Sequence, residues 1–117
     1  MLPINFFALL DMLGGDTQRV STLLQTFLKE LASDLESSQL ALESGDMGSL
    51  RKIAHRVKGT SANLHATLVS AAARELEQAC IEGTASAVAA TQREMQEQAE
   101  ILMDAIRDWQ QRLATSA

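Results

Sequence analysis

Three short glycine-containing breaks divide this chain into segments in which apolar residues recur with helical spacing, and this pattern limits the folds that the chain can adopt. The breaks are Gly14-Gly15-Asp16, Ser44-Gly45-Asp46 and Glu82-Gly83-Thr84. At each break the glycine can end one helix in the left-handed conformation, and the Asp or Thr after it can cap the next helix through its side-chain oxygen. A weaker break lies between Asn63 and Thr67. The chain can therefore fold back on itself, which a single long coiled coil cannot do.

Between the breaks, apolar residues recur at steps of three, four and seven. The first long segment carries Val20, Leu24, Phe27, Leu31, Leu35 and Leu42, and the last carries Val88, Met95, Ala99, Leu102, Ile106, Trp109 and Leu113. The last set forms a heptad seam, which is typical of helices that cross at shallow angles. The spacing predicts a short helix at about 4–13 and long helices at about 17–43, 47–63, 67–82 and 85–114. We expect an all-α fold, an antiparallel four-helix bundle with a short extra N-terminal helix, in a single domain over residues 1–117.

Composition narrows the class of protein further. A chain of 117 residues is enough for one domain, and it has no apolar run long enough to span a membrane. The apolar start lacks a basic region, so we expect no signal peptide and a cytoplasmic location. The net charge of -5 disfavours nucleic acid and anionic membrane as partners. The single cysteine, Cys80, excludes a disulfide framework and a multi-cysteine metal site, and we expect it to be a small core residue.

The segment from Ala54 to Leu64 differs from an ordinary bundle helix, because it carries a histidine and an internal glycine away from its core face. At 100° per residue, one face of this helix collects the residues expected to pack in the core: Leu50, Ile53, Ala54, Val57, Ser61 and Leu64. His55 projects about 155° from the centre of that face, so we expect it to be exposed. On its own, an exposed histidine is most often an ordinary solvated side chain.

The neighbours of His55 favour a functional role instead. Small residues share its face, namely Gly48, Gly59 and Ala62, and cations lie within side-chain reach, namely Arg51, Lys52 and Lys58. A glycine inside a helix costs about 1 kcal/mol relative to alanine, and Gly59 faces away from the core. The small residues would let another protein approach, and the cations would hold an anion on the imidazole. This pattern indicates an exposed phosphoryl acceptor.

The segment also resembles the motif of histidine-containing phosphotransfer (HPt) domains. That motif is an alanine-histidine, two variable residues, a lysine-glycine, a serine or threonine, and a leucine a few residues later. Ala54-His55, Lys58-Gly59, Thr60 and Leu64 stand in those places. Together with Gly14-Gly15-Asp16 before a long helix and Leu76-Glu77 after the motif, the resemblance covers roughly residues 4–113.

The resemblance implies a role for each matching residue. His55 would carry the phosphoryl group on Nε2, and Lys58 would neutralise the phosphoryl oxygens. Gly59 would leave room for the active site of the partner, and Thr60 would help to orient the imidazole or the phosphate. Glu77 stands where the family often has a polar residue close to the histidine, although the residues alone favour an ordinary solvated glutamate there.

The chain departs from the family pattern at His65. A glycine is usual at this position, directly after the motif leucine, and would favour a left-handed turn that histidine adopts less easily. The path of the chain after the motif is therefore open. His65 is also a rival acceptor about 15 Å along the helix from His55, but it lacks the lysine at +3 and the glycine at +4.

The resemblance implies a phosphorelay intermediate that takes a phosphoryl group from a receiver-domain aspartate onto His55 and passes it to another receiver. Its partners would be response-regulator receiver domains, which would supply the divalent metal. The chain itself would bind no cofactor or metal and would act as a monomer, either free or as the cytoplasmic tail of a membrane sensor kinase. It has no glycine-rich phosphate loop, so we expect no kinase activity of its own. One alternative is the phosphoacceptor domain of a chemotaxis-type histidine kinase. Another is a non-catalytic helical adaptor, and this second alternative would leave Gly59 and the cations near His55 unexplained.

Overall fold

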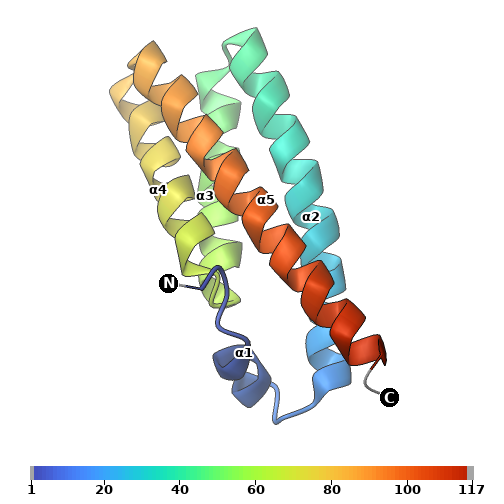
Figure 1. Ribbon diagram of the computed structural model, residues 1–117. Helices are drawn as coiled ribbons and strands as arrows, with labels where there is room; N and C mark the ends of the chain where they lie inside the picture. Colours follow the sequence, from blue (N-terminus) through green and yellow to red (C-terminus); the bar gives the residue numbers. More distant parts are fainter. Residues whose placement is uncertain (1, 116–117) are drawn as a thin grey trace.

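The computed structural model describes residues 2–115, which form five helices and no strand (Figure 1). The helices are α1 (Phe6–Met12), α2 (Thr17–Ser44), α3 (Met47–Asn63), α4 (Thr67–Glu82) and α5 (Ala85–Thr115). Each end lies within two residues of the boundary that the sequence predicts. The all-α architecture expected from the apolar spacing is confirmed.

The predicted breaks form through the expected backbone chemistry. Gly45 and Gly83 follow α2 and α4 with φ of 72° and 76°, in the left-handed region that glycine tolerates best. Asp16 and Asp46 then accept hydrogen bonds from backbone N–H groups in the first turns of α2 and α3. At the last break, the backbone carbonyl of Thr84 accepts from the Val88 N–H of α5 at 2.9 Å, whereas the side-chain cap expected of Thr84 stays a prediction. The four long helices therefore run up and down.

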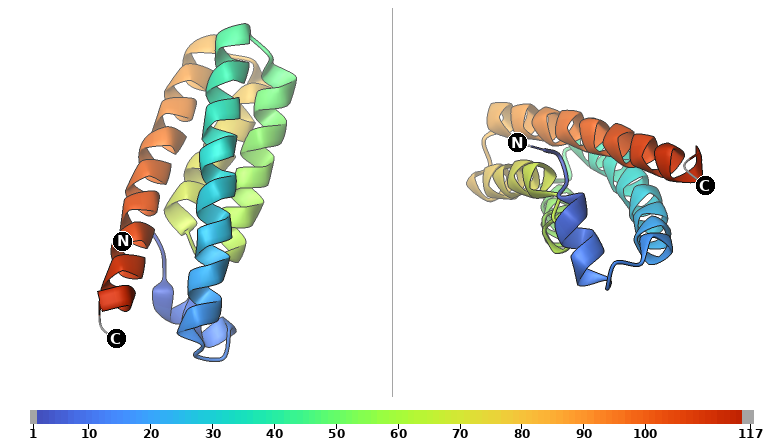
Figure 2. Two further views of the ribbon diagram at one scale, coloured as in Figure 1. Left: turned by 90° about the vertical axis from the view of Figure 1, so that its right-hand side faces the viewer. Right: turned by 60° about the horizontal axis from the view of Figure 1, so that its bottom comes forward.

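The long helices pack in the cyclic order α2, α3, α4, α5, each against its two neighbours (Figures 1 and 2). The molecule is elongated, with extents of 49 × 21 × 20 Å. Because α2 and α5 are much longer than α3 and α4, they extend past them at one end of the bundle, and α1 lies there (Figure 1). Leu9 of α1 is fully buried, and the ring of Phe6 stacks on Trp109 at 5.1 Å between centroids.

The core is aliphatic and follows the predicted helix faces. The seam of α5 is buried at Val88, Met95, Ala99, Leu102 and Ile106. Between Val88 and Met95 the seam position is taken by Gln92, whose buried amide donates to the buried hydroxyl of Ser38 at 3.3 Å. Cys80 lies in this core as expected, and burial raises the pKa of its thiol. Across residues 2–115, no helix combines the length and apolarity needed to cross a bilayer.

The turn between α3 and α4 keeps its left-handed residue although the glycine is missing. His65 has a φ of 59° and is the one non-glycine residue with positive φ in the described part of the chain. Backbone hydrogen bonds hold the turn from both sides: Ala66 N donates to Ser61 O at 2.9 Å, and Asn5 N donates to His65 O at 3.1 Å. The surrounding contacts therefore impose on histidine a conformation that it adopts only at some cost.

Candidate functional site

Helix α3 presents His55 to solvent. The residues that the helical wheel assigns to the core are buried, and Leu50 and Ala54 are completely so. The His55 side chain lies on the opposite side of α3 and is 69% exposed. The prediction of an accessible imidazole on the second long helix is confirmed.

Glu77 on α4 joins His55 to Lys58. One carboxylate oxygen, Oε2, lies 2.7 Å from His55 Nδ1, and the other, Oε1, accepts from Lys58 Nζ at 2.7 Å. The Glu77 side chain is only 16% exposed. The interpretation of Glu77 as an ordinary solvated glutamate is therefore wrong. Because α4 runs antiparallel to α3, residue 77 lies beside residues 55 to 58. The periodicity of a single helix does not predict such a contact between two helices.

The electrostatics of this triad fix the proton on the imidazole. The hydrogen bond from Lys58, and to a smaller extent that from His55, holds the pKa of the Glu77 carboxyl below its ordinary value of 4.5. Glu77 is therefore ionised at neutral pH, and an ionised carboxylate can only accept hydrogen bonds. Nδ1 of His55 must then be the donor. In the neutral imidazole this leaves Nε2 with its lone pair free.

Gly59 lies on the same face of α3, one turn after His55, with open space above it. A Cβ atom built on Gly59 would have no other atom within 4 Å, and the residue is exposed. Neither a positive φ nor the approach of another helix requires glycine at this position. The packing of the bundle therefore gives no reason for Gly59.

Thr60 is not brought together with these residues. It is half-buried and lies about 140° around the helix from His55. Within the described chain, no hydrogen bond joins its hydroxyl to His55 or to Glu77. The neighbouring turn is anchored in another way, because the Ser70 hydroxyl donates to the backbone carbonyl of Lys58 at 2.9 Å.

The cations around His55 divide into two groups. Arg56 turns toward α2, where its Nη2 and Nε donate to Asp34 Oδ1 at 2.6 and 3.2 Å, and this pairing raises its pKa. Arg51 and Lys52 stay exposed on α3. No local sequence pattern indicates the pairing of Arg56, since its partner is 22 positions away on another helix. The charge of Arg56 is thus directed toward α2 and away from the imidazole.

His65, the rival acceptor, lies in a different environment. It is half-buried in the turn after α3 and lines a shallow pocket with Leu2, Asn5 and Thr67. No ion pair holds its ring in the described structure. His65 thus lacks the carboxylate and lysine that accompany His55.

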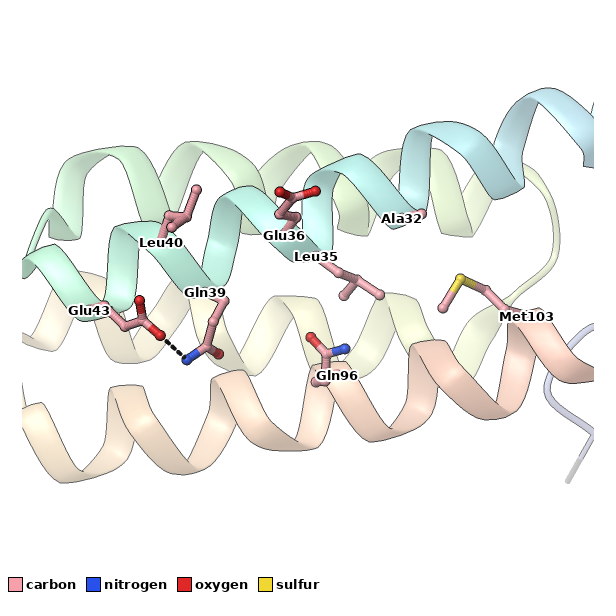
Figure 3. Close-up of a pocket in the computed structure, with 8 residues that line it drawn as sticks. All are labelled: Ala32, Leu35, Glu36, Gln39, Leu40, Glu43, Gln96 and Met103. Atoms are coloured by element: carbon pink, nitrogen blue, oxygen red, sulfur yellow. Dashed lines mark hydrogen bonds between the residues drawn. The ribbon is translucent and has the colours of Figure 1, made fainter.

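A groove of about 500 Å³ lies elsewhere, between α2 and α5, with α3 and α4 behind it (Figure 3). Its lining is aliphatic, carboxylate and amide: Ala32, Leu35, Glu36, Gln39, Leu40, Glu43, Gln96 and Met103. Its lining contains neither a histidine nor a cation, so it lacks the combination of side chains found around His55. Over residues 2–115, no three His, Cys, Asp or Glu side chains are grouped so as to hold a metal ion.

Two solved structures resemble the whole molecule. The histidine-containing phosphotransfer protein B (HptB) of Pseudomonas aeruginosa PAO1 is 27% identical and superposes with a TM-score of 0.85, over 94% of this chain and 96% of that one. The HPT domain of a sensor hybrid histidine kinase from Shewanella superposes with a TM-score of 0.79 at 17% identity, over 94% and 95% of the two chains. At 17% identity, the similarity to the Shewanella domain supports the fold of this chain and nothing more. A search of curated protein sequences finds no significant match.

The sequence model of the Hpt domain family matches residues 22–109. The matched region contains α3 and α4 entire, and with them His55, Lys58, Gly59 and Glu77. Hpt domains interact with receiver domains in phosphorelays. Since the match covers well over half of the chain, the chain belongs to the Hpt domain family and has a histidine phosphotransfer role in a phosphorelay.

Proposed function

We propose that His55 accepts the phosphoryl group from an aspartyl phosphate of a receiver domain and passes it to the aspartate of another receiver. This assignment rests on the exposure of the His55 ring and on the hydrogen bond at its Nδ1. His55 is largely exposed, yet its Nδ1 is bound 2.7 Å from Glu77, so the free nitrogen is Nε2. A nucleophile that is both accessible and oriented is what phosphoryl transfer requires.

Lys58 and Gly59 would serve the transfer in different ways. The Lys58 ammonium is held one turn from His55 by Glu77, close enough to share its charge with a phosphoryl group on the ring. The transferring group spreads negative charge over its equatorial oxygens, so a nearby cation favours the transition state. The open space over Gly59 would admit the active site of the receiver to Nε2.

The proposed partners are response-regulator receiver domains. The receiver would bring the carboxylate and the divalent metal, and this chain would bring the imidazole with its oriented surroundings. We propose that the chain works in the cytoplasm as a monomer. Its net charge of -5 disfavours nucleic acid as a partner. No cofactor of its own is needed for this division of labour.

The test is transfer from a ³²P-labelled receiver to purified protein. Wild type should become labelled, and His55→Gln should not. The matched control is His65→Asn, because asparagine tolerates the left-handed conformation at this turn and should leave labelling unchanged. Labelling of His55→Gln at the wild-type rate would overturn the assignment.

A further inference from the structure

Arg74, an exposed residue of α4, has no carboxylate on its own helix with which to pair. It stands three residues before Glu77, about 60° around α4 from it, on the side away from the core. Its neighbours three and four positions away along the helix are Ser70, Ala71, Glu77 and Gln78. Of these only Glu77 is acidic, and its two oxygens are already engaged by His55 and Lys58.

The facing helix offers Arg74 no partner either. Helix α3 lies along α4 and contains no aspartate or glutamate between Met47 and Asn63 (Figure 1). Across residues 2–115, the Arg74 guanidinium takes part in no ion pair. In a chain with 15 acidic and 10 basic residues, this guanidinium thus stays free for a group from outside.

The alignment of the two helices places Arg74 beside the opening at Gly59. Glu77 contacts residues 55 and 58, and α4 runs antiparallel to α3, so a residue three positions earlier on α4 lies about one turn further along α3. The bond from the Ser70 hydroxyl to the Lys58 carbonyl, at 2.9 Å, fixes the same alignment. A Cβ atom on Gly59 would meet no other atom within 4 Å. Nothing in the domain therefore stands between Arg74 and the space that a partner would enter.

Other arginines of the chain show the contrast. Three of them form ion pairs with aspartates of the same chain: Arg56 with Asp34, Arg107 with Asp104 and Arg112 with Asp108. An unpaired guanidinium keeps all its N–H donors, in a planar fork that matches a carboxylate. Arg74 is therefore equipped to bind an anionic group of a protein that covers His55.

We infer that Arg74 is a specificity-determining residue that binds a carboxylate on the surface of the docked receiver. This inference rests on the proposed function of His55. Lys58 already stands next to the ring to face a phosphoryl group, whereas Arg74 lies one turn further on, where the body of the receiver would pass. Arg74 thus acts on the binding of the receiver and not on the reactivity of the imidazole.

A charge at the edge of an interface chiefly changes the rate of encounter and its dependence on salt. A receiver that places a carboxylate opposite Arg74 would be favoured. A receiver that places a lysine or arginine there would be rejected by like-charge repulsion. One side chain on α4 would in this way help to select among receivers that share the same chemistry.

The test is transfer from a receiver domain phosphorylated by acetyl phosphate, titrated at low and high salt against wild type, Arg74→Ala, Arg74→Glu and Arg74→Lys. The matched control is Arg93→Glu, which reverses the charge of an exposed arginine on α5 beside a hollow between α2 and α5. Labelling of each protein by phosphoramidate, a small donor to imidazoles, measures the reactivity of His55 without a receiver.

Arg74→Ala should raise the KM for the receiver about threefold to fivefold at low salt and leave the maximal rate unchanged. Arg74→Glu should raise the KM further, Arg74→Lys should recover part of the loss, and high salt should reduce every difference. Arg93→Glu should behave as wild type, and phosphoramidate should label all the proteins at one rate.

A wild-type KM in both Arg74→Ala and Arg74→Glu would overturn the inference and leave the role of His55 standing. Slower labelling of Arg74→Ala by phosphoramidate would also overturn it, because Arg74 would then act on the phosphoryl group at the ring. Failure of both donors to label His55 in wild type would instead count against the proposed function.

Discussion

At the scale of single residues, the proposed function depends on an imidazole that is exposed to solvent and yet held in one orientation. Exposed side chains usually sample several rotamers, and fixing one costs conformational entropy. Here Glu77, itself held by Lys58, supplies the contact that orients His55. Two residues beside the ring, Lys58 and Gly59, can be tested separately because one contributes charge and the other contributes space.

Replacing Lys58 with alanine should slow transfer about tenfold to a hundredfold without abolishing it. The physical reason is the loss of one partly solvated, charge-assisted contact, worth about 1.5–3 kcal/mol at most. Lys58→Arg should recover part of the rate, since the guanidinium keeps the charge but is wider. The measurement is a time-resolved transfer assay at low and high salt, with Lys29→Ala, an exposed lysine on α2, as control. Wild-type rates for Lys58→Ala at both salts would show that Lys58 is only part of a solvated surface.

Replacing Gly59 with glutamine should block transfer while the fold persists. The space above Gly59 is open, so a larger side chain is accommodated by the isolated domain but meets the incoming receiver. Gly59→Ala should stabilise the domain by up to about 1 kcal/mol through helix propensity. Circular dichroism and the transfer assay measure the two effects, and Ala90→Gln, at an exposed position on α5, is the matched control. An unfolded Gly59→Gln protein would contradict this account of the glycine.

At the scale of helices, the site needs α4 as well as α3. Glu77 ties the two together through its bonds to His55 and Lys58, while Arg56 and Asp34 tie α3 to α2. The reactive segment of α3 is thus anchored from both sides. This has a consequence for stability that depends on pH.

Wild type should lose its stability advantage over Glu77→Gln as the solution is acidified. The contact with Lys58, and then that with His55, lowers the pKa of Glu77 in the folded protein below 4.5. A carboxyl with a depressed folded pKa stabilises the fold above the unfolded pKa, and this contribution is lost as the pH falls through the folded pKa. Urea unfolding at neutral pH and at about pH 3 measures the difference, with Glu75→Gln as control. A difference between wild type and Glu77→Gln that stays constant down to pH 3 would contradict the ion-pair account.

The helices themselves could be predicted from the sequence because their signals are local. Gly45 and Asp46 end one helix and begin the next within two residues, and the apolar steps identify each buried face. The exposed position of His55 followed from the same periodicity. Contacts between helices could not be predicted in this way. The bond of Glu77 to His55 depends on the relative height of α3 and α4, which no short window of sequence encodes.

The turn after α3 shows a different limit of sequence reasoning. His65 replaces a glycine that the family pattern favours, and local preference alone leaves the path of the chain open. The structure resolves this through backbone bonds from Asn5 and to Ser61, which hold His65 at a φ of 59°. Tertiary contacts here override the preference of a single residue.

At the scale of the whole molecule, the charge is segregated. The exposed face of α3 carries Arg51 and Lys52 beside the reactive residues, whereas residues 30–44 of α2 and 94–106 of α5 carry acidic residues and no lysine or arginine. A chain that is acidic as a whole therefore has a local basic surface around one imidazole. Such a surface suits an anionic group and a partner that approaches from that side.

Phosphorylation is expected at Nε2 of His55, because Glu77 occupies Nδ1. The most direct measurement is the ¹⁵N–³¹P coupling in protein labelled with ¹⁵N-histidine and phosphorylated by a receiver, recorded at alkaline pH where phosphohistidine persists. One phosphorylated ring is expected, that of His55, with coupling to Nε2. Coupling to Nδ1 of His55, or phosphorylation of His65, would contradict it.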